Sequence, residues 1–139
     1  MSVVGTWRLE SFESRSEAGP AHPMGERPDG LLVYTSTGWM CVHISHAERT
    51  PFASADPLLA TQAEQAHAFA TSFITYCGRY EMSGNKVRHH VEVSVHPNWR
   101  GFVFEREFTL DGDTLVLRTP PHEIGGRAVS SELRWRRVG

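Results

Sequence analysis

The stretch HHVEVSVHPNWRG, from His89 to Gly101, concentrates ionisable side chains on one predicted β-strand. Strand alternation places His90, Glu92 and Ser94 on one face and the neighbouring valines on the other. A histidine beside a carboxylate can act as a general acid or base, because the carboxylate fixes the tautomer and raises the basicity of the imidazole. His90 and Glu92 are therefore candidate catalytic residues.

Arg106 is a third candidate, on the next predicted strand. Strand alternation puts Arg106 on the same face as Phe102, Phe104 and Phe108, so its guanidinium lies among three phenylalanines. One interpretation is a side chain that snorkels to water at the mouth of a barrel. The other is an inward side chain, which needs a partner because an unpaired buried charge is strongly destabilising. Glu92 is the expected partner.

The two faces of the strand at residues 86–96 compete for the interior. Periodicity alone favours buried valines and a solvated face carrying His90 and Glu92. Two arrangements would put the polar face inside. A helix or terminal segment could cover the valines, or a β-bulge near His89 and His90 could switch the register. The pattern by itself leaves these alternatives open.

Other chemistries find little support in the sequence. His89 and His90 point to opposite faces of a regular strand, and His96 is too distant from His90 along that strand unless it bends. The other histidines lie in separate elements, so we expect no metal and no cofactor; a haem or zinc site built from one or two histidines is the alternative. Cys41 and Cys77 match no zinc or redox spacing, and we expect two reduced, mostly buried thiols. No phosphate-binding loop or nucleophile elbow occurs.

The elements that must position these residues are mostly strands. Short alternating segments separated by turn residues predict about eight of them, at 5–13, 31–35, 39–45, 78–82, 86–96, 102–110, 114–119 and 127–137. Between the third and the fourth, apolar residues recur at helical spacing from Pro57 to Tyr76, which predicts one amphipathic helix. Its start is either the Asp56-Pro57 pair or a capping box formed by Thr61 and Glu64.

Composition sets the class of protein. The chain has 139 residues, 40% of them hydrophobic and 22% charged, with a formal net charge of -2. We expect one domain, residues 1–139, that binds neither nucleic acid nor membrane. Residues 1–4 run directly into the first predicted strand, so we expect no secretory signal and a cytoplasmic location. Consecutive antiparallel strands with tight turns close most naturally into a small all-β barrel.

Motifs along nearly the whole chain resemble the bacterial and fungal lipocalin-like domain family. They are Gly5-Thr-Trp-Arg-Leu, Gly30-Leu-Leu-Val-Tyr-Thr, Gly38-Trp-Met, Phe52-Ala-Ser-Ala-Asp-Pro, Gly78-Arg-Tyr-Glu, His89-His-Val-Glu-Val-Ser, Pro97-Asn-Trp, Thr119-Pro-Pro, Gly125-Gly and Leu133-Arg-Trp. The resemblance implies an antiparallel, roughly eight-stranded lipocalin-like barrel with a ligand cavity. It also implies that Trp7 closes the bottom of the barrel with a basic residue near the end of the chain, one of Arg134, Arg136 or Arg137.

With a cavity implied, we expect the polar face of the 86–96 strand to point inward. Aromatic and aliphatic side chains would form the lining, and a few polar groups would orient the ligand. Besides His90, Glu92 and Arg106, the candidate ligand-binding residues are Tyr34, His43, Tyr80, Ser94, Trp99, Phe102, Phe104, Phe108, Leu117 and Trp135.

Three functional hypotheses follow. The first is a carrier of a small hydrophobic or amphipathic metabolite, held by Arg106 and Glu92. The second is a cofactor-free cyclase or isomerase of a natural-product pathway, acting on a polyketide-like or terpenoid substrate. In it, His90 is the acid or base and Arg106 stabilises an enolate or carbonyl oxygen. The third is a filled barrel that interacts through the loop at 47–57. A homodimer is the assembly considered for all three.

Overall fold

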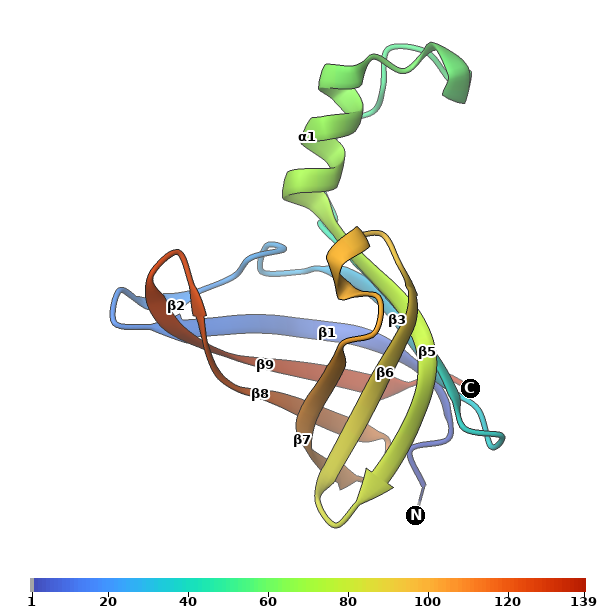
Figure 1. The fold of residues 1–139 in the computed structure, drawn as a ribbon, viewed down its shortest axis with the longest axis vertical. Coiled ribbons are helices and arrows are strands. Elements are labelled where there is room, and N and C mark those ends of the chain that lie inside the picture. The colour runs from blue at the N-terminus through green and yellow to red at the C-terminus, as the bar shows by residue number, and fades with distance from the viewer. Residues whose placement is uncertain (1) are drawn as a thin grey trace.

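The computed structural model describes residues 2–139 and confirms an antiparallel β-barrel (Figure 1). Within these residues nine strands form one sheet, in the order β2-β1-β3-β4-β5-β6-β7-β8-β9, and a β1–β9 pairing closes it. Eight strands make the closed ring, and β2 is attached to one end of β1. The strands are β1 Gly5–Ser16, β2 Gly19–Ala21, β3 Asp29–Tyr34, β4 Trp39–Ser45, β5 Phe73–Ser83, β6 Lys86–Ser94, β7 Val103–Asp111, β8 Thr114–Ile124 and β9 Arg127–Arg137.

The helix lies between β4 and β5, not between the third and fourth strands as predicted. The difference arises from β2, a three-residue strand in a Gly- and Pro-containing segment that the sequence favours as a loop. It pairs with the end of β1 through Ser14–Ala21, Arg15–Pro20 and Ser16–Gly19. Such a short strand has too little alternation to be recognised from its sequence.

The segment at residues 46–72, here called the arm, leaves the barrel after β4 and returns at β5 (Figure 1). It contains a 3₁₀ turn, η1 at Pro57–Leu59, and one α-helix, α1 at Gln62–Ser72. The predicted capping box is confirmed, because Thr61 and Glu64 exchange side-chain and backbone hydrogen bonds. No helix in the described chain is long and apolar enough to cross a membrane.

The prediction of a helix as far as Tyr76 is wrong. From Phe73 onward the chain pairs with β4, beginning with Phe73 opposite Ser45, and these ladder bonds displace the helical ones. The arm also buries little of its apolar surface: Phe69 of α1 is 41% exposed, and Leu58 and Leu59 of η1 are 92% and 65% exposed. The helix does not cover the outer face of β6, where Val93 is 63% exposed, which removes the helix as the cover that would have turned the polar face inward.

One end of the barrel is closed by Trp7, which is fully buried on β1. Its indole Nε1 donates to the Val3 carbonyl at 2.8 Å, and the Arg137 guanidinium lies over its ring at 4.3 Å from the centroid. Arg137 also donates to the carbonyls of Val4 and Ser2, each at 2.8 Å. Of the three basic residues considered, Arg137 is thus the partner of Trp7.

Replacing Arg137 by alanine should lower the free energy of unfolding by about 2 kcal/mol, because a cation–π contact and two hydrogen bonds are lost together. Urea denaturation followed by tryptophan fluorescence measures this. The matched control is Arg136→Ala, one position along the same strand but exposed. Equal losses in the two variants would contradict the role given to Arg137.

Candidate ligand-binding site

The inner face of β6 carries Val87, His89 and Val91, which are 1%, 2% and 3% exposed. The expectation that His90 and Glu92 point inward is wrong. Glu92 is exposed, and His90 lies on the outer face with its Nε2 3.0 Å from Glu81 Oε1. The physical reason is the alternation itself: burying the valines stabilises the barrel more than burying a glutamate.

A β-bulge interrupts β6, later than the position considered near His89 and His90. The register with β5 shifts between Cys77 and Gly78, so that Cys77 pairs with Val93 and Gly78 with Val91. Val93 consequently lies on the outside, 63% exposed, and Ser94 lies opposite the buried Tyr76. Gly78 permits this geometry, because a Cβ at that position would overlap the His90 carbonyl oxygen.

His89 is held inside the barrel between two tyrosines. Its Nε2 lies 2.6 Å from the Tyr34 hydroxyl of β3, and its Nδ1 lies 2.7 Å from the Tyr76 hydroxyl of β5. Tyr34 and Tyr76 are themselves 1% and 7% exposed. The three side chains form a buried hydrogen-bonded chain that links three strands.

Burial lowers the pKa of His89 to about 3, and the positive charge of Arg106 adds to this effect. At neutral pH the imidazole therefore carries one N–H and one lone pair, so one tyrosine donates to it and the other accepts. We assign Tyr34 as the donor. Neither tyrosine has a second partner among the hydrogen bonds of the described residues, but Tyr34 is the more deeply buried, at 1% exposed against 7%, so an unused hydroxyl proton would cost more there.

This assignment leaves the Tyr76 hydroxyl as a free donor. Nδ1–H of His89 donates to the Tyr76 oxygen, so the hydroxyl proton of Tyr76 can reach a further acceptor. The Tyr76 ring contacts Trp99 at 6.2 Å and Phe104 at 5.4 Å between centroids. Burial raises the pKa of Tyr76, and the charge of Arg106 opposes this rise, which places the guanidinium close enough to act on the phenol.

Arg106 lies on the inner face of β7, opposite Val87 of β6. The predicted ion pair with Glu92 is absent, because Glu92 is outside the barrel. Among residues 2–139 no carboxylate forms an ion pair with Arg106; its Nη1 donates to the Glu105 carbonyl at 3.1 Å and its guanidinium lies 5.0 Å from the centroid of Phe104. The side chain is half-buried. Part of its donor capacity is therefore open to solvent or to a ligand.

The first residues of β7 are paired on one side only. β7 pairs with β6 through residues 103–107 and with β8 only from Glu107 onward. Residues 103–106 thus have no ladder partner on the β8 side. The inner-face side chains of Phe104, Arg106 and Phe108 are half-buried, whereas the facing Leu117 is buried.

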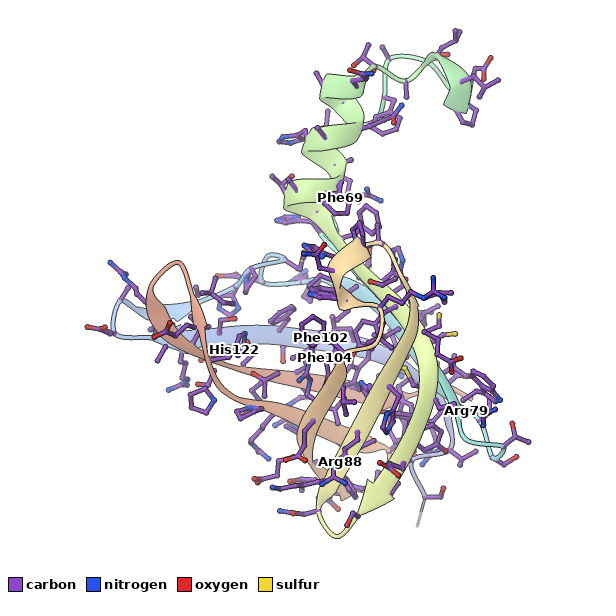
Figure 2. The ribbon with its side chains drawn as sticks, viewed as in Figure 1. Phe69, Arg79, Arg88, Phe102, Phe104 and His122 are labelled. Atoms are coloured by element: carbon purple, nitrogen blue, oxygen red, sulfur yellow. The ribbon has the colours of Figure 1, made fainter. Side chains whose placement is uncertain are left out.

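The structure separates the other predicted ligand-binding residues into two groups. Most of them lie on the inner face or pack against the core, namely Tyr34, Tyr80, Ser94, Trp99, Phe104, Phe108, Leu117 and Trp135. His43 is exposed on the outer face of β4, where it stacks on Phe73, so its expected position in the cavity is wrong. Phe102 is 53% exposed and stacks on Phe104 at the start of β7 (Figure 2).

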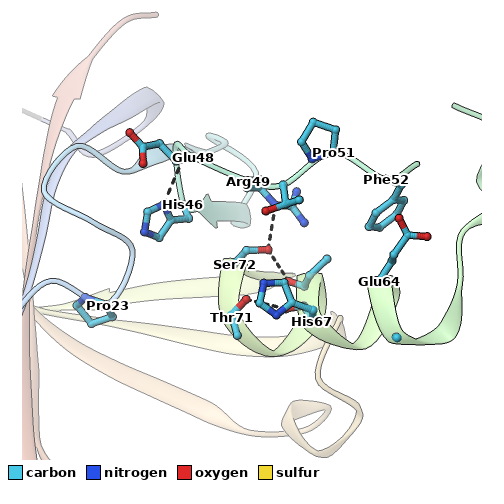
Figure 3. Close-up of a pocket in the computed structure, with 13 residues that line it drawn as sticks. Pro23, His46, Glu48, Arg49, Pro51, Phe52, Glu64, His67, Thr71 and Ser72 are labelled. Carbon is cyan, nitrogen blue, oxygen red and sulfur yellow. Dashed lines mark hydrogen bonds between the residues drawn. The ribbon is translucent and has the colours of Figure 1, made fainter. Parts of the chain in front are cut away.

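A cleft of about 990 Å³ lies outside the barrel, between α1 and the incoming chain of the arm (Figure 3). Two of its polar side chains are hydrogen-bonded within the arm. Arg49 Nε donates to Ser72 Oγ at 2.9 Å, and Glu64 Oε2 accepts from the Ala53 amide at 2.8 Å. We therefore take it as the space between the two limbs of the arm and place the candidate site in the barrel. Across residues 2–139 no three His, Cys, Asp or Glu side chains are grouped to hold a metal ion.

Comparison with known proteins agrees with this architecture. The profile of the lipocalin-like domain family matches residues 4–138. The chain belongs to this family. It is also 33% identical over 98 residues to the 4'-hydroxy-3'-methoxypropiophenone carrier protein ppsC of Aspergillus oryzae, an alignment that covers 64% of this chain and 88% of the relative. No solved structure gave a significant match.

Two residues of this lipocalin-like site escaped the sequence analysis, Tyr76 and His89. Tyr76 fell within the predicted helix, although Tyr76, Gly78 and Tyr80 already have strand alternation. His89 was placed correctly on the valine face, but that face was not taken as the inner one. A lone histidine between two inward valines was the signal that could have identified it.

The neutral, buried state of His89 predicts acid sensitivity. Its folded pKa of about 3 lies below the usual value of 6.5. The unfolded chain therefore binds more protons between these values, so this contribution is fully present above about pH 6.5 and is lost as the pH falls toward 3. Urea denaturation at pH 7 and at about pH 4.5 measures the loss, on the order of 2 kcal/mol after allowance for structural relaxation.

His89→Gln keeps a polar side chain that does not titrate in this range, and it should lose less stability than the wild type between the two pH values. His90→Gln, on the outer face, is the matched control and should behave as the wild type does. An unchanged acid dependence in His89→Gln would show that His89 is not the group responsible.

Proposed function

We propose that the protein binds a small, largely apolar metabolite with an acceptor oxygen, and that it holds this ligand in the barrel beside Tyr76 and Arg106. The observation that carries the proposal is the chain from Tyr34 through His89 to Tyr76. With His89 neutral, the chain ends in a hydroxyl donor that no acceptor in the described structure uses. Arg106 supplies a second donor, and it has no carboxylate partner.

The surroundings of these donors favour an aromatic ligand. Trp99 and Phe104 meet edge to face at 5.4 Å, and Phe104 stacks on Phe102. Aromatic rings prefer such offset and edge contacts with other rings. A carbonyl, enolate or phenolate oxygen would accept from Tyr76 and Arg106, and the rest of the molecule would pack on the rings.

The relative from Aspergillus oryzae supports this choice of ligand. Its name describes a carrier of 4'-hydroxy-3'-methoxypropiophenone, which is an aromatic ketone. That compound combines a phenyl ring with a carbonyl oxygen, the two features that the barrel interior is suited to bind. We propose an aromatic ketone or a related phenol as the ligand class for the present chain.

A carrier accounts for the site better than an enzyme does. The cyclase or isomerase considered from the sequence relied on His90 as acid or base, and His90 is outside the barrel. His89 replaces it in the interior, but both of its ring nitrogens are occupied and its low pKa makes it a weak base. Binding requires only the donors that the site provides.

The proposal predicts that 4'-hydroxy-3'-methoxypropiophenone binds and that Tyr76→Phe weakens its Kd by roughly 5- to 30-fold, the value of one buried hydrogen bond. Arg106→Gln should weaken binding by a similar factor. Isothermal titration calorimetry provides the Kd. His90→Gln, on the outer face, should bind as the wild type does.

A second ligand isolates the carbonyl oxygen. The analogue in which a methylene replaces the ketone should bind weakly to the wild type and should be insensitive to Tyr76→Phe. If the ketone binds to Tyr76→Phe and to Arg106→Gln as tightly as it binds to the wild type, the site lies elsewhere and the proposal fails. Conversion of the ketone during the titration would instead favour an enzyme.

A further inference from the structure

Cys41 of β4 and Cys77 of β5 stand directly opposite each other in the antiparallel register. The backbone hydrogen bonds between these two strands show whether the cysteines form a hydrogen-bonded or a non-hydrogen-bonded pair. Tyr80 N donates to Gly38 O at 2.9 Å, and His46 N donates to Ser72 O at 2.8 Å. Hydrogen-bonded pairs therefore fall on even-numbered residues, such as Met40 with Gly78. The two cysteines form a non-hydrogen-bonded pair.

That position brings the two thiols within bonding reach. Residues opposite each other at a non-hydrogen-bonded position have Cα atoms about 4.5 Å apart, closer than hydrogen-bonded pairs. A disulfide spans Cα separations from about 4.4 to 6.8 Å. Burial, with the neighbouring Cys41 thiol as a further cause, raises the pKa of Cys77 to about 11. This influence of one thiol on the other is a second indication that they lie close together.

The pair lies on the outside of the barrel, contrary to the expectation of two mostly buried thiols. Both cysteines are free; Cys41 is exposed and Cys77 is half-buried. Val33 of β3 lies opposite Cys41, and Val93 of β6 lies opposite Cys77. The four side chains form a row across four strands that carries no charged group. Cys41 is thus the thiol that a reagent in solution meets first.

We propose that Cys41 and Cys77 form a reversible cross-strand disulfide by exchange with a small disulfide such as oxidised glutathione. The Cys41 thiolate attacks one glutathione sulfur, a mixed disulfide forms and one glutathione thiolate leaves. The Cys77 thiolate then attacks the Cys41 sulfur and releases the second glutathione. Two protein thiols are oxidised, one glutathione disulfide is reduced to two thiols, and excess reduced glutathione reverses the reaction.

This bond would tie β4 to β5 at the base of the arm. The chain enclosed between Cys41 and Cys77 contains the whole arm and Tyr76, which immediately precedes Cys77. Closing a loop of this size restricts the unfolded chain, so oxidation stabilises the fold. It also fixes the strand that carries Tyr76 without placing any group inside the barrel.

The test treats the folded protein with oxidised glutathione and measures the intact mass, the peptide map and the Tm. The expected product is a monomer lighter by two hydrogen masses, with Cys41 and Cys77 in one linked peptide pair. Its Tm should rise by roughly 5 °C or more. Reduced glutathione in excess should restore the original mass and Tm.

Single variants separate the two steps. Cys77→Ser should retain one glutathione on Cys41 and show no rise in Tm, whereas Cys41→Ser should react far more slowly because Cys77 is half-buried. A wild-type product that carries glutathione on both cysteines, or that is joined between two chains, would overturn the proposal. Linkage that forms only in urea would also overturn it, since the folded geometry would then not be responsible.

Discussion

Closure of the sheet between β1 and β9 is the constraint on which the other features depend. The pairing runs from Trp7–Arg137 to Arg15–Ser130 and includes a bulge at Leu9–Ser11. A closed sheet gives every strand one inward face, and the inward positions of distant strands then converge. Tyr34, Tyr76, His89 and Arg106 come from four strands and meet only because the ring is closed. The candidate site is therefore a product of topology and has no local sequence motif.

The buried histidine gives the interior its chemical character. Removing an imidazole from water disfavours its charged form, and both of its nitrogens must then find partners. Tyr34 and Tyr76 provide them, at 2.6 and 2.7 Å. Such a chain stabilises a barrel little more than well-packed aliphatic side chains would. A polar cluster with a strongly shifted pKa in an otherwise aliphatic and aromatic interior is more typical of a functional site.

The sequence predicted the strands and the barrel well because short alternating segments and turn residues are local signals. It failed where tertiary pairing overrides local preference. The helix ends at Ser72 because Phe73 joins a ladder with Ser45, and no property of residues 73–76 alone indicates this. The bulge that turns Ser94 inward depends on Gly78 in the neighbouring strand.

The candidate site was predicted only where local strand alternation was sufficient. Simple alternation placed Arg106 and Phe104 on one face of β7, and the structure shows that this face is the inner one. The choice between His89 and His90 was wrong although the valine periodicity of β6 favours the His89 face as the inner one, because the polar cavity implied by the family resemblance favoured the other face. The opposition of Cys41 and Cys77 could not be read from their spacing, since the arm separates them along the chain.

The position of Glu92 outside the barrel has a consequence for the ligand. A glutamate beside Arg106 would have neutralised the guanidinium and used its donors, leaving an interior suited to a hydrocarbon. Without it, the interior carries a positive charge whose contacts among residues 2–139 are a backbone carbonyl and the face of Phe104. The Arg106 side chain is half-buried and so stays partly open to solvent. Under the proposed carrier function, a ligand that covers this side chain must supply acceptor oxygens in place of solvent, and we therefore propose that aromatic ketones or phenolates bind better than apolar molecules of equal size.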